Sequence, residues 1–236
     1  MCFSASASFT AAGFLSTIAI ATLHRATRPQ IKPVALLPLF FGIQQGLEGL
    51  VWISLNAPGD SLWWHIIQGI GIYGFVFFAA LFWPIWIPYA LYCVEENTSY
   101  RKLLYKVVIT QLILAAVYIV SWHFTPIIAT NINCHIAYSI FSMQFSWLAY
   151  NPTSLLLRLG LNFVKAFISI AYLSATAFVF FGSSIPYAKV MGALILSAYV
   201  VAELGYRLSF ASVWCFFAAV ISMLTYYVVY TYQKRS

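Results

Sequence analysis

Long apolar segments separated by short polar connections run through the whole chain. A helix that crosses about 30 Å of hydrocarbon needs about 20 mostly apolar residues, whereas a membrane β-barrel shows alternating segments of about ten residues. The apolar runs here are continuous, so they predict an all-α, polytopic transmembrane helical bundle that forms a single integral membrane domain over residues 1–236. The seven predicted helices lie near residues 4–23, 34–55, 62–93, 103–123, 155–182, 187–205 and 209–231.

The stretch 134–150 is the ambiguous part of this pattern. Its polar residues recur at helical spacing and form one stripe, made of His135, Ser139, Ser142 and Ser146. This spacing favours an amphipathic helix that lies on the outer leaflet with the stripe toward water. Alternatively, the segment folds back over the bundle and its stripe faces an internal cavity. If the stretch spanned the membrane, the bundle would have eight helices.

Lysine and arginine residues are biased toward one side of the predicted bundle. Nine of the twelve fall together in the seven-helix arrangement: Arg25, Arg28, Lys32, Arg101, Lys102, Lys106, Lys189, Lys234 and Arg235. Basic connections stay in the cytoplasm, so we expect a multi-pass protein of the inner cell membrane with its N-terminus outside and its C-terminus cytoplasmic. An eight-helix bundle groups equally many basic residues but exposes the basic tail outside, which favours seven helices.

The composition agrees with a membrane location and excludes a soluble protein. Hydrophobic residues make up 63% of the 236 positions and charged residues only 7%, against about 25% charged in a soluble domain. The net charge of +7 reflects the one-sided bias and suits contact with anionic lipid headgroups. No basic face with regularly spaced aromatic residues is present, so membrane lipids, and not nucleic acids, are the expected partners. The sequence also allows a homo-oligomer as the assembled form.

Few polar side chains fall within the predicted spans, and such residues usually face the bundle and often mark a function. In the second span, Gln44, Glu48 and Trp52 share one helix face at i, i+4 and i+8, with Gln45 beside them. Glu48 lies about 12 Å from the outer end of this span at 1.5 Å per residue. Its carboxyl group either ties helices together by hydrogen bonds or acts as a general base, proton carrier or metal ligand.

Three further polar residues are candidates for a ligand pocket with Gln44 and Gln45: Ser139, Lys165 and Glu203. Lys165 lies within the fifth span, where it can pair with Glu48 or extend toward the interface. Glu203 precedes Arg207 by one helical turn, a spacing that favours a local ion pair near the outer surface.

Cysteine and histidine residues gather on the predicted outer side, above Glu48. They are Cys2, His65, Cys134, His135 and Cys215. These side chains are ligands for zinc or copper, but an oxidising exterior also favours a disulfide of Cys2 with Cys134 or Cys215. The adjacent pair Cys134-His135 matches no metal motif, so a metal site, a disulfide, plain buried cysteines and a nucleophilic thiol all stay open.

Three blocks resemble an uncharacterised bacterial family of multi-span membrane proteins. They are the opening Met-Cys-Phe-Ser-Ala-Ser-Ala-Ser-Phe, the run from Phe41 to Trp52 and the run from Ala211 to Ala219. The resemblance implies a multi-span helical fold and no known activity. A looser similarity, in helix count and residue types alone, links the chain to seven-span lipid hydrolases that bind zinc, although the last span lacks their histidines.

Three functions follow from these observations. In the first, a Cys/His/Glu pocket in the outer half of the bundle binds a metal ion or small ligand. As a hydrolase, it would use the metal to lower the pKa of bound water and Glu48 as the catalytic base. In the second, Glu48 serves a proton-coupled transporter or channel. In the third, the protein is a structural or partner-binding membrane subunit, and its polar groups serve packing.

Overall fold

The computed structural model describes residues 4–59, 61–124, 126–132, 135–140, 143–144, 155–205 and 217–234. Helices occupy parts of all seven predicted spans, which confirms the all-α fold class. In chain order the elements are α1 (Ala5–Arg25), η1 (Pro29–Ile31), α2 (Lys32–Ala35), α3 (Leu37–Leu55), α4 (Leu62–Val76), η2 (Phe77–Phe82), α5 (Trp83–Val94), α6 (Thr98–Phe124), β1 (Ile127–Ile132), β2 (His135–Ile140), β3 (Met143–Gln144), α7 (Leu155–Thr176), η3 (Phe178–Phe180), α8 (Ala188–Gly205) and α10 (Ala218–Lys234).

Several of these helices are long and apolar enough to cross a membrane, as expected for a membrane protein. In the described part of the chain they form five stretches: Ala5–Arg25, Pro29–Leu55, Leu62–Val94, Thr98–Val120 and Ala188–Gly205. Only 17% of the apolar window in Thr98–Val120 is buried inside the bundle. The large apolar side chains that this helix exposes would be costly in water, and they suit contact with lipid.

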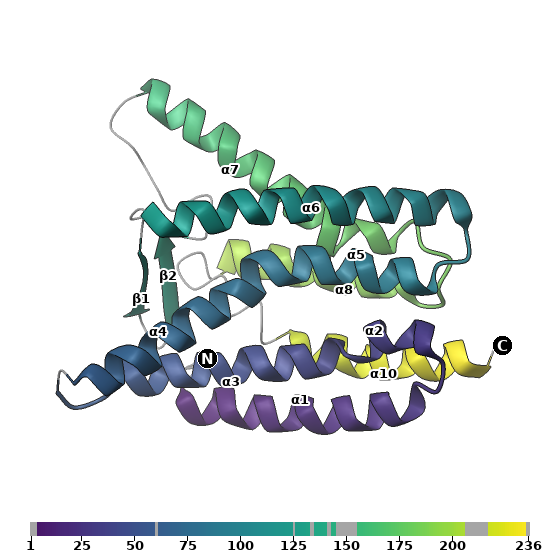
Figure 1. Cartoon of the computed structure of the whole chain (residues 1–236), viewed down its shortest axis with the longest axis horizontal. Helices are drawn as coiled ribbons and strands as arrows, with labels where there is room; N and C mark the ends of the chain where they lie inside the picture. The colour runs from purple at the N-terminus through teal and green to yellow at the C-terminus, as the bar shows by residue number, and fades with distance from the viewer. Residues whose placement is uncertain are drawn as a thin grey trace.

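Helices α1, α3 and α10 lie on one side and α5, α6 and α8 on the other, along one common direction, while α4 and α7 run obliquely to them (Figure 1). Helix α1 packs along α3 and also against α10, while α3 packs against α4. Helix α5 contacts α6 and α7. The ends of α1, α5 and α10 and the starts of α2, α6 and α8 meet at one end of the bundle, so the basic connections gather as the seven-helix arrangement requires.

Small residues allow α1 and α3 to approach closely. A Cβ atom added at Gly42 would lie 3.1 Å from the Ser16 hydroxyl, and one added at Gly49 would lie 2.7 Å from the Phe9 ring. Such contacts between small residues and a neighbouring helix are the usual way in which membrane helices pack. Ser4 caps the start of α1, since its hydroxyl accepts a hydrogen bond from the Ala7 amide.

The long third span is interrupted in its middle. A π-helical segment, η2, separates α4 from α5, and Pro84 follows it at the second position of α5. Proline has no N–H to bond to the carbonyl one turn earlier, so the regular ladder is broken at this point and the backbone widens. Single π turns of this kind occur often at functional sites.

The helix predicted for 134–150 is wrong over the residues that the structure describes. Two strands, β1 and β2, pair antiparallel with Ile127 opposite Ile140 and Ile132 opposite His135, and β3 extends the sheet. The polar spacing between positions 135 and 139 is four residues, which puts both on one face of a strand as well as of a helix. An eighth helical span is therefore excluded for 135–140 and 143–144.

The sheet packs back onto the C-terminal parts of α3 and α4. Ile136 and Tyr138 join one apolar cluster with Val51 and Phe75, and the Tyr138 and Phe75 rings stack with centroids 4.6 Å apart. Of the two alternatives for this segment, folding back over the bundle agrees with the described residues.

Candidate functional site

Three polar side chains of α3 are buried in the interior of the bundle. Gln44, Gln45 and Glu48, here called the polar stripe, are all buried, and the Glu48 side chain is only 1% exposed. Trp52 continues the same face and is also buried. The face was predicted from the i, i+4, i+8 spacing, and the packing of α1, α4 and α10 around α3 explains its burial.

Two hydrogen bonds orient the polar stripe. The Gln45 amide Nε2 donates to Glu48 Oε2 at 3.2 Å, and the Trp83 indole Nε1 donates to Gln44 Oε1 at 2.7 Å. Because an indole N–H can only donate, it fixes the oxygen of the Gln44 amide toward α5 and leaves the NH2 group on the other side. The Trp83 ring itself stacks on Phe41, with centroids 3.9 Å apart.

Trp83 connects the polar stripe to the interruption of the third span. It is the first residue of α5 and directly follows η2. A backbone change in η2 would therefore move a group that is bonded to Gln44. Sequence reasoning missed this contact, because Trp83 and Gln44 are 39 positions apart and no local pattern links them.

The Trp52 indole offers a further donor on this face. No acceptor in the described part of the chain bonds to its buried Nε1–H. A buried donor without an acceptor is costly, so this position suits a water molecule or an acceptor group of a ligand.

His65 does not join Glu48 in the structure. Its side chain is exposed in the first turn of α4, where its backbone amide bonds to the Ser61 carbonyl at 3.2 Å. A Cβ atom added at Gly71 would lie 3.1 Å from the Leu47 carbonyl oxygen, which sets Gly71 level with Glu48 along α3. His65 precedes Gly71 by six residues, or about 9 Å of helix.

His135 comes closer to the predicted arrangement. It begins β2, its side chain is only 9% exposed, and its strand packs over the C-terminal parts of α3 and α4. Burial lowers the pKa of the His135 imidazole, which favours the neutral form that can bind a metal or accept a hydrogen bond. Ser139 lies on the same strand and pairs in register with Ile128 and Gln144.

The remaining predicted residues are spread over other elements. Lys165 belongs to α7, which packs mainly on α5, and Glu203 lies buried in the last turn of α8. Cys2, Cys134 and Cys215 lie outside the described residues. Across the described ranges, no group of three or more His, Cys, Asp or Glu side chains could hold a metal ion.

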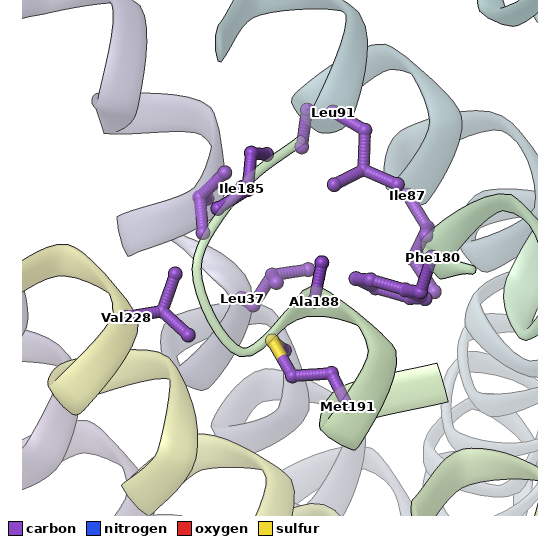
Figure 2. A pocket seen from close by; sticks show the side chains of 10 residues that line it. Leu37, Ile87, Leu91, Phe180, Ile185, Ala188, Met191 and Val228 are labelled. Atoms are coloured by element: carbon purple, nitrogen blue, oxygen red, sulfur yellow. The ribbon is translucent and has the colours of Figure 1, made fainter. Parts of the chain in front are cut away.

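A pocket at the basic end of the bundle is lined by apolar side chains alone. It opens between α2, α3, α5, α8 and α10, and its side chains are apolar (Figure 2). The labelled side chains carry only carbon atoms and the sulfur of Met191. With no donor, acceptor or charge along its wall, this pocket is a packing space and the polar stripe remains the candidate site.

Glu95 is a second buried carboxyl group that sequence reasoning missed. It follows α5, is 3% exposed, and accepts hydrogen bonds from the Ser183 hydroxyl at 2.9 Å, the Ser184 amide at 3.0 Å and the Asn97 amide at 3.0 Å. Burial alone raises the pKa of Glu95, but the bonds from Ser184, Asn97 and Ser183 outweigh it and hold the pKa below its ordinary value.

The chain matches one family model over its whole length. A family model described as a family of unknown function, DUF6629, matches residues 1–236. The chain belongs to this family. The match agrees with the resemblance carried by the opening residues, and membership in DUF6629 brings no activity with it. No curated protein and no solved structure matches the chain.

Proposed function

We propose that this protein is a multi-pass transporter or channel of the inner membrane that moves protons through Glu48. The observation that carries the proposal is the burial of the Glu48 carboxyl group, 1% exposed, within a membrane-spanning helix. An ionisable group at that depth is costly, and such groups often mark ion pathways or proton relays.

The hydrogen bond between Gln45 and Glu48 depends on whether the Glu48 carboxyl group is charged. Gln45 donates to one carboxylate oxygen at 3.2 Å, and a hydrogen bond to a charged acceptor is about twice as strong as one to a neutral acceptor. Protonation of Glu48 therefore weakens its hold on Gln45 and loosens the polar stripe.

In this proposal the conformational change occurs at η2, the π-helical interruption of the third span. The Trp83 indole joins the Gln44 amide to the first residue after η2. A π segment that converts to a regular helix rotates everything on one side of it relative to the other. In this proposal, the charge on Glu48 biases that conversion, and the carboxyl group faces one side of the membrane and then the other.

The proton itself is the probe in the experiment. Purified protein in liposomes that enclose a pH-sensitive dye receives a potassium diffusion potential through valinomycin, and acidification of the lumen is recorded. We expect wild-type protein to acidify the lumen several times faster than protein-free liposomes, and Glu48→Gln to acidify it at the protein-free rate.

A matched variant separates this effect from a general loss of charge. Glu96 is exposed on the connection between α5 and α6, so Glu96→Gln should acidify the lumen as fast as wild type. Wild-type protein that acidifies no faster than protein-free liposomes contradicts the proposal. A Glu48→Gln variant that matches wild type contradicts it equally.

A second candidate function is a metal or small-ligand site in the outer half, with zinc or copper and hydrolytic chemistry at Glu48. Two observations favour it: the buried His135 on the sheet above α3, and the Trp52 indole N–H to which no described residue offers an acceptor. Elemental analysis of protein purified without chelators tests it. Stoichiometric zinc or copper that is lost in His135→Ala supports this function, and metal-free wild-type protein excludes it.

A further inference from the structure

Two positive charges meet on one tyrosine where α1 and α10 end. The Arg25 guanidinium carbon lies 6.0 Å from the centroid of the Tyr230 ring, and the Lys234 ammonium lies 4.6 Å from the same centroid. Arg25 is the last residue of α1 and Lys234 is the last residue of α10. The ring attracts each cation through its electron-rich face, but it does not neutralise the repulsion between them.

No carboxylate balances these charges in the part of the chain that the structure describes. Neither Arg25 nor Lys234 has an ion pair there. Glu48 and Glu203 lie within other helices, and the Glu95 carboxylate accepts hydrogen bonds from Ser183 and Ser184. Glu96 lies on the connection to α6, which packs against α5 and α7. Arg25 and Lys234 thus form a positively charged site.

The two helix ends are held in register. The side-chain amide of Gln233 lies 3.0 Å from the Thr27 hydroxyl, which joins the end of α10 to the residues after α1. Because α1 and α10 also pack along each other, the two cations keep their position without a partner charge from any described residue. A fixed pair of cations is a preorganised site for an anion.

The site lies at the depth of lipid headgroups. Helix α1 is long and apolar enough to span a membrane, and Arg25 ends it. Both helices expose apolar side chains before their ends, since Ile20 of α1 is 71% exposed and Tyr227 of α10 is also exposed, so these helices offer apolar surface to acyl chains. Clusters of basic residues next to spanning helices attract anionic lipids.

We propose that Arg25, Tyr230 and Lys234 form a binding site for the phosphate group of an anionic phospholipid. The two cations bind the phosphate oxygens, and the tyrosine holds the cations apart at a fixed spacing. The acyl chains follow the exposed faces of α1 and α10. The site is independent of Glu48 and of which leaflet contains the basic end.

Native mass spectrometry of the full-length protein in detergent, titrated with phosphatidylglycerol or phosphatidylcholine, tests the proposal. We expect wild-type protein to retain phosphatidylglycerol in preference to phosphatidylcholine. Each basic residue near the headgroup strengthens the binding of an anionic lipid, so the double variant Arg25→Gln, Lys234→Gln should bind phosphatidylglycerol at least about tenfold more weakly.

Two control variants make the result specific. Lys102→Gln with Lys106→Gln removes two exposed cations of α6 at the same end, and it should bind phosphatidylglycerol as wild type does. Arg25→Lys with Lys234→Arg keeps both charges and should also retain the lipid. A loss in the α6 variant as large as in the Arg25 and Lys234 variant would overturn the site, as would full retention by the latter.

A competition arm distinguishes a lipid from free phosphate. Millimolar sodium phosphate should leave bound phosphatidylglycerol in place, because the acyl chains contribute to its binding. Displacement of the lipid by inorganic phosphate alone would show an anion site without lipid specificity and would overturn the proposal.

Discussion

Glu95 and Glu48 are buried carboxyl groups whose surroundings differ in kind. Glu95 lies at the end of α5 and accepts bonds from two backbone amides and two serine hydroxyls of neighbouring connections. Glu48 lies within α3 and accepts a bond from the side-chain amide of Gln45 on its own helix. Two backbone amides and two serine hydroxyls hold Glu95 outside the spans, whereas a rotatable side-chain amide is among the groups that contact Glu48 inside a span.

The difference separates a structural carboxylate from a candidate functional one. Backbone donors cannot turn away, so Glu95 stays charged and joins the α5–α6 connection to the connection before α8. An amide side chain can turn, and Gln44 beside it is bonded to Trp83 next to the π-helical η2. We expect Glu95 to control stability and Glu48 to control proton movement, and each prediction below tests this division.

Removing the Glu95 side chain should have the largest effect on stability. Glu95→Ala leaves the Ser183 hydroxyl and the Ser184 and Asn97 amides without their acceptor, which costs about 3 kcal/mol of unfolding free energy. Urea unfolding in detergent micelles measures it. Glu96→Ala, at an exposed position, should change stability by less than about 0.5 kcal/mol, and equal losses in both variants would contradict a structural role for Glu95.

The glycine beside these serines should be nearly as sensitive. A Cβ atom at Gly182 would overlap the Tyr100 ring, and that ring is fixed because the Tyr100 hydroxyl donates to the Val179 carbonyl at 2.6 Å. Gly182→Ala should therefore cost about 2 kcal/mol through overpacking. Gly69→Ala is the control, since a Cβ atom there meets no other atom within 4 Å. A stable Gly182→Ala variant would show that this connection is not held as described.

Two tryptophans of α5 separate stability from proton movement. Trp83 donates to the Gln44 amide at 2.7 Å, and Trp86 donates to the Pro33 carbonyl at 3.0 Å. Replacing either by Phe keeps a ring and removes one N–H donor, at a cost of about 1 kcal/mol each. Only Trp83→Phe should slow acidification in the liposome assay. Equal rates in the two variants would break the proposed link between η2 and Glu48.

Acid should weaken the Glu95 contacts gradually. The folded pKa of Glu95 lies below its ordinary value of 4.5, so the folded state binds fewer protons than the unfolded state. Its contribution to stability is complete above pH 4.5 and is lost as the pH falls through the folded pKa. Urea midpoints of wild type and Glu95→Ala should converge below that range, and a constant difference at all pH values would contradict the shift.

The spans could be predicted from the sequence because apolar length is a local property. Glu48 stood out for the same reason, as a single acidic residue in an apolar run. The strand His135–Ile140 could not be predicted from polar spacing, since a separation of four residues suits helix and strand alike. The alternation of Ile136, Tyr138 and Ile140 is a signal for a strand that the sequence analysis did not use.

Contacts between distant residues could not be predicted in this way. Trp83 and Gln44 are 39 positions apart, and Ser183 and Glu95 are 88 positions apart. Their pairing depends on how helices pack, and no local pattern records it. The sequence likewise does not show that the His65 side chain is exposed, and among the described residues no group of three or more His, Cys, Asp or Glu side chains forms a metal site.

Infrared difference spectroscopy of the reconstituted protein tests most directly whether Glu48 binds and releases a proton. A protonated carboxyl group inside a membrane gives a C=O stretching band of its own, apart from the amide bands. We predict that this band grows reversibly as the pH is lowered in wild type and in Glu96→Gln, and that it is missing in Glu48→Gln. A band of unchanged size in Glu48→Gln, or no reversible band in wild type, would contradict the account.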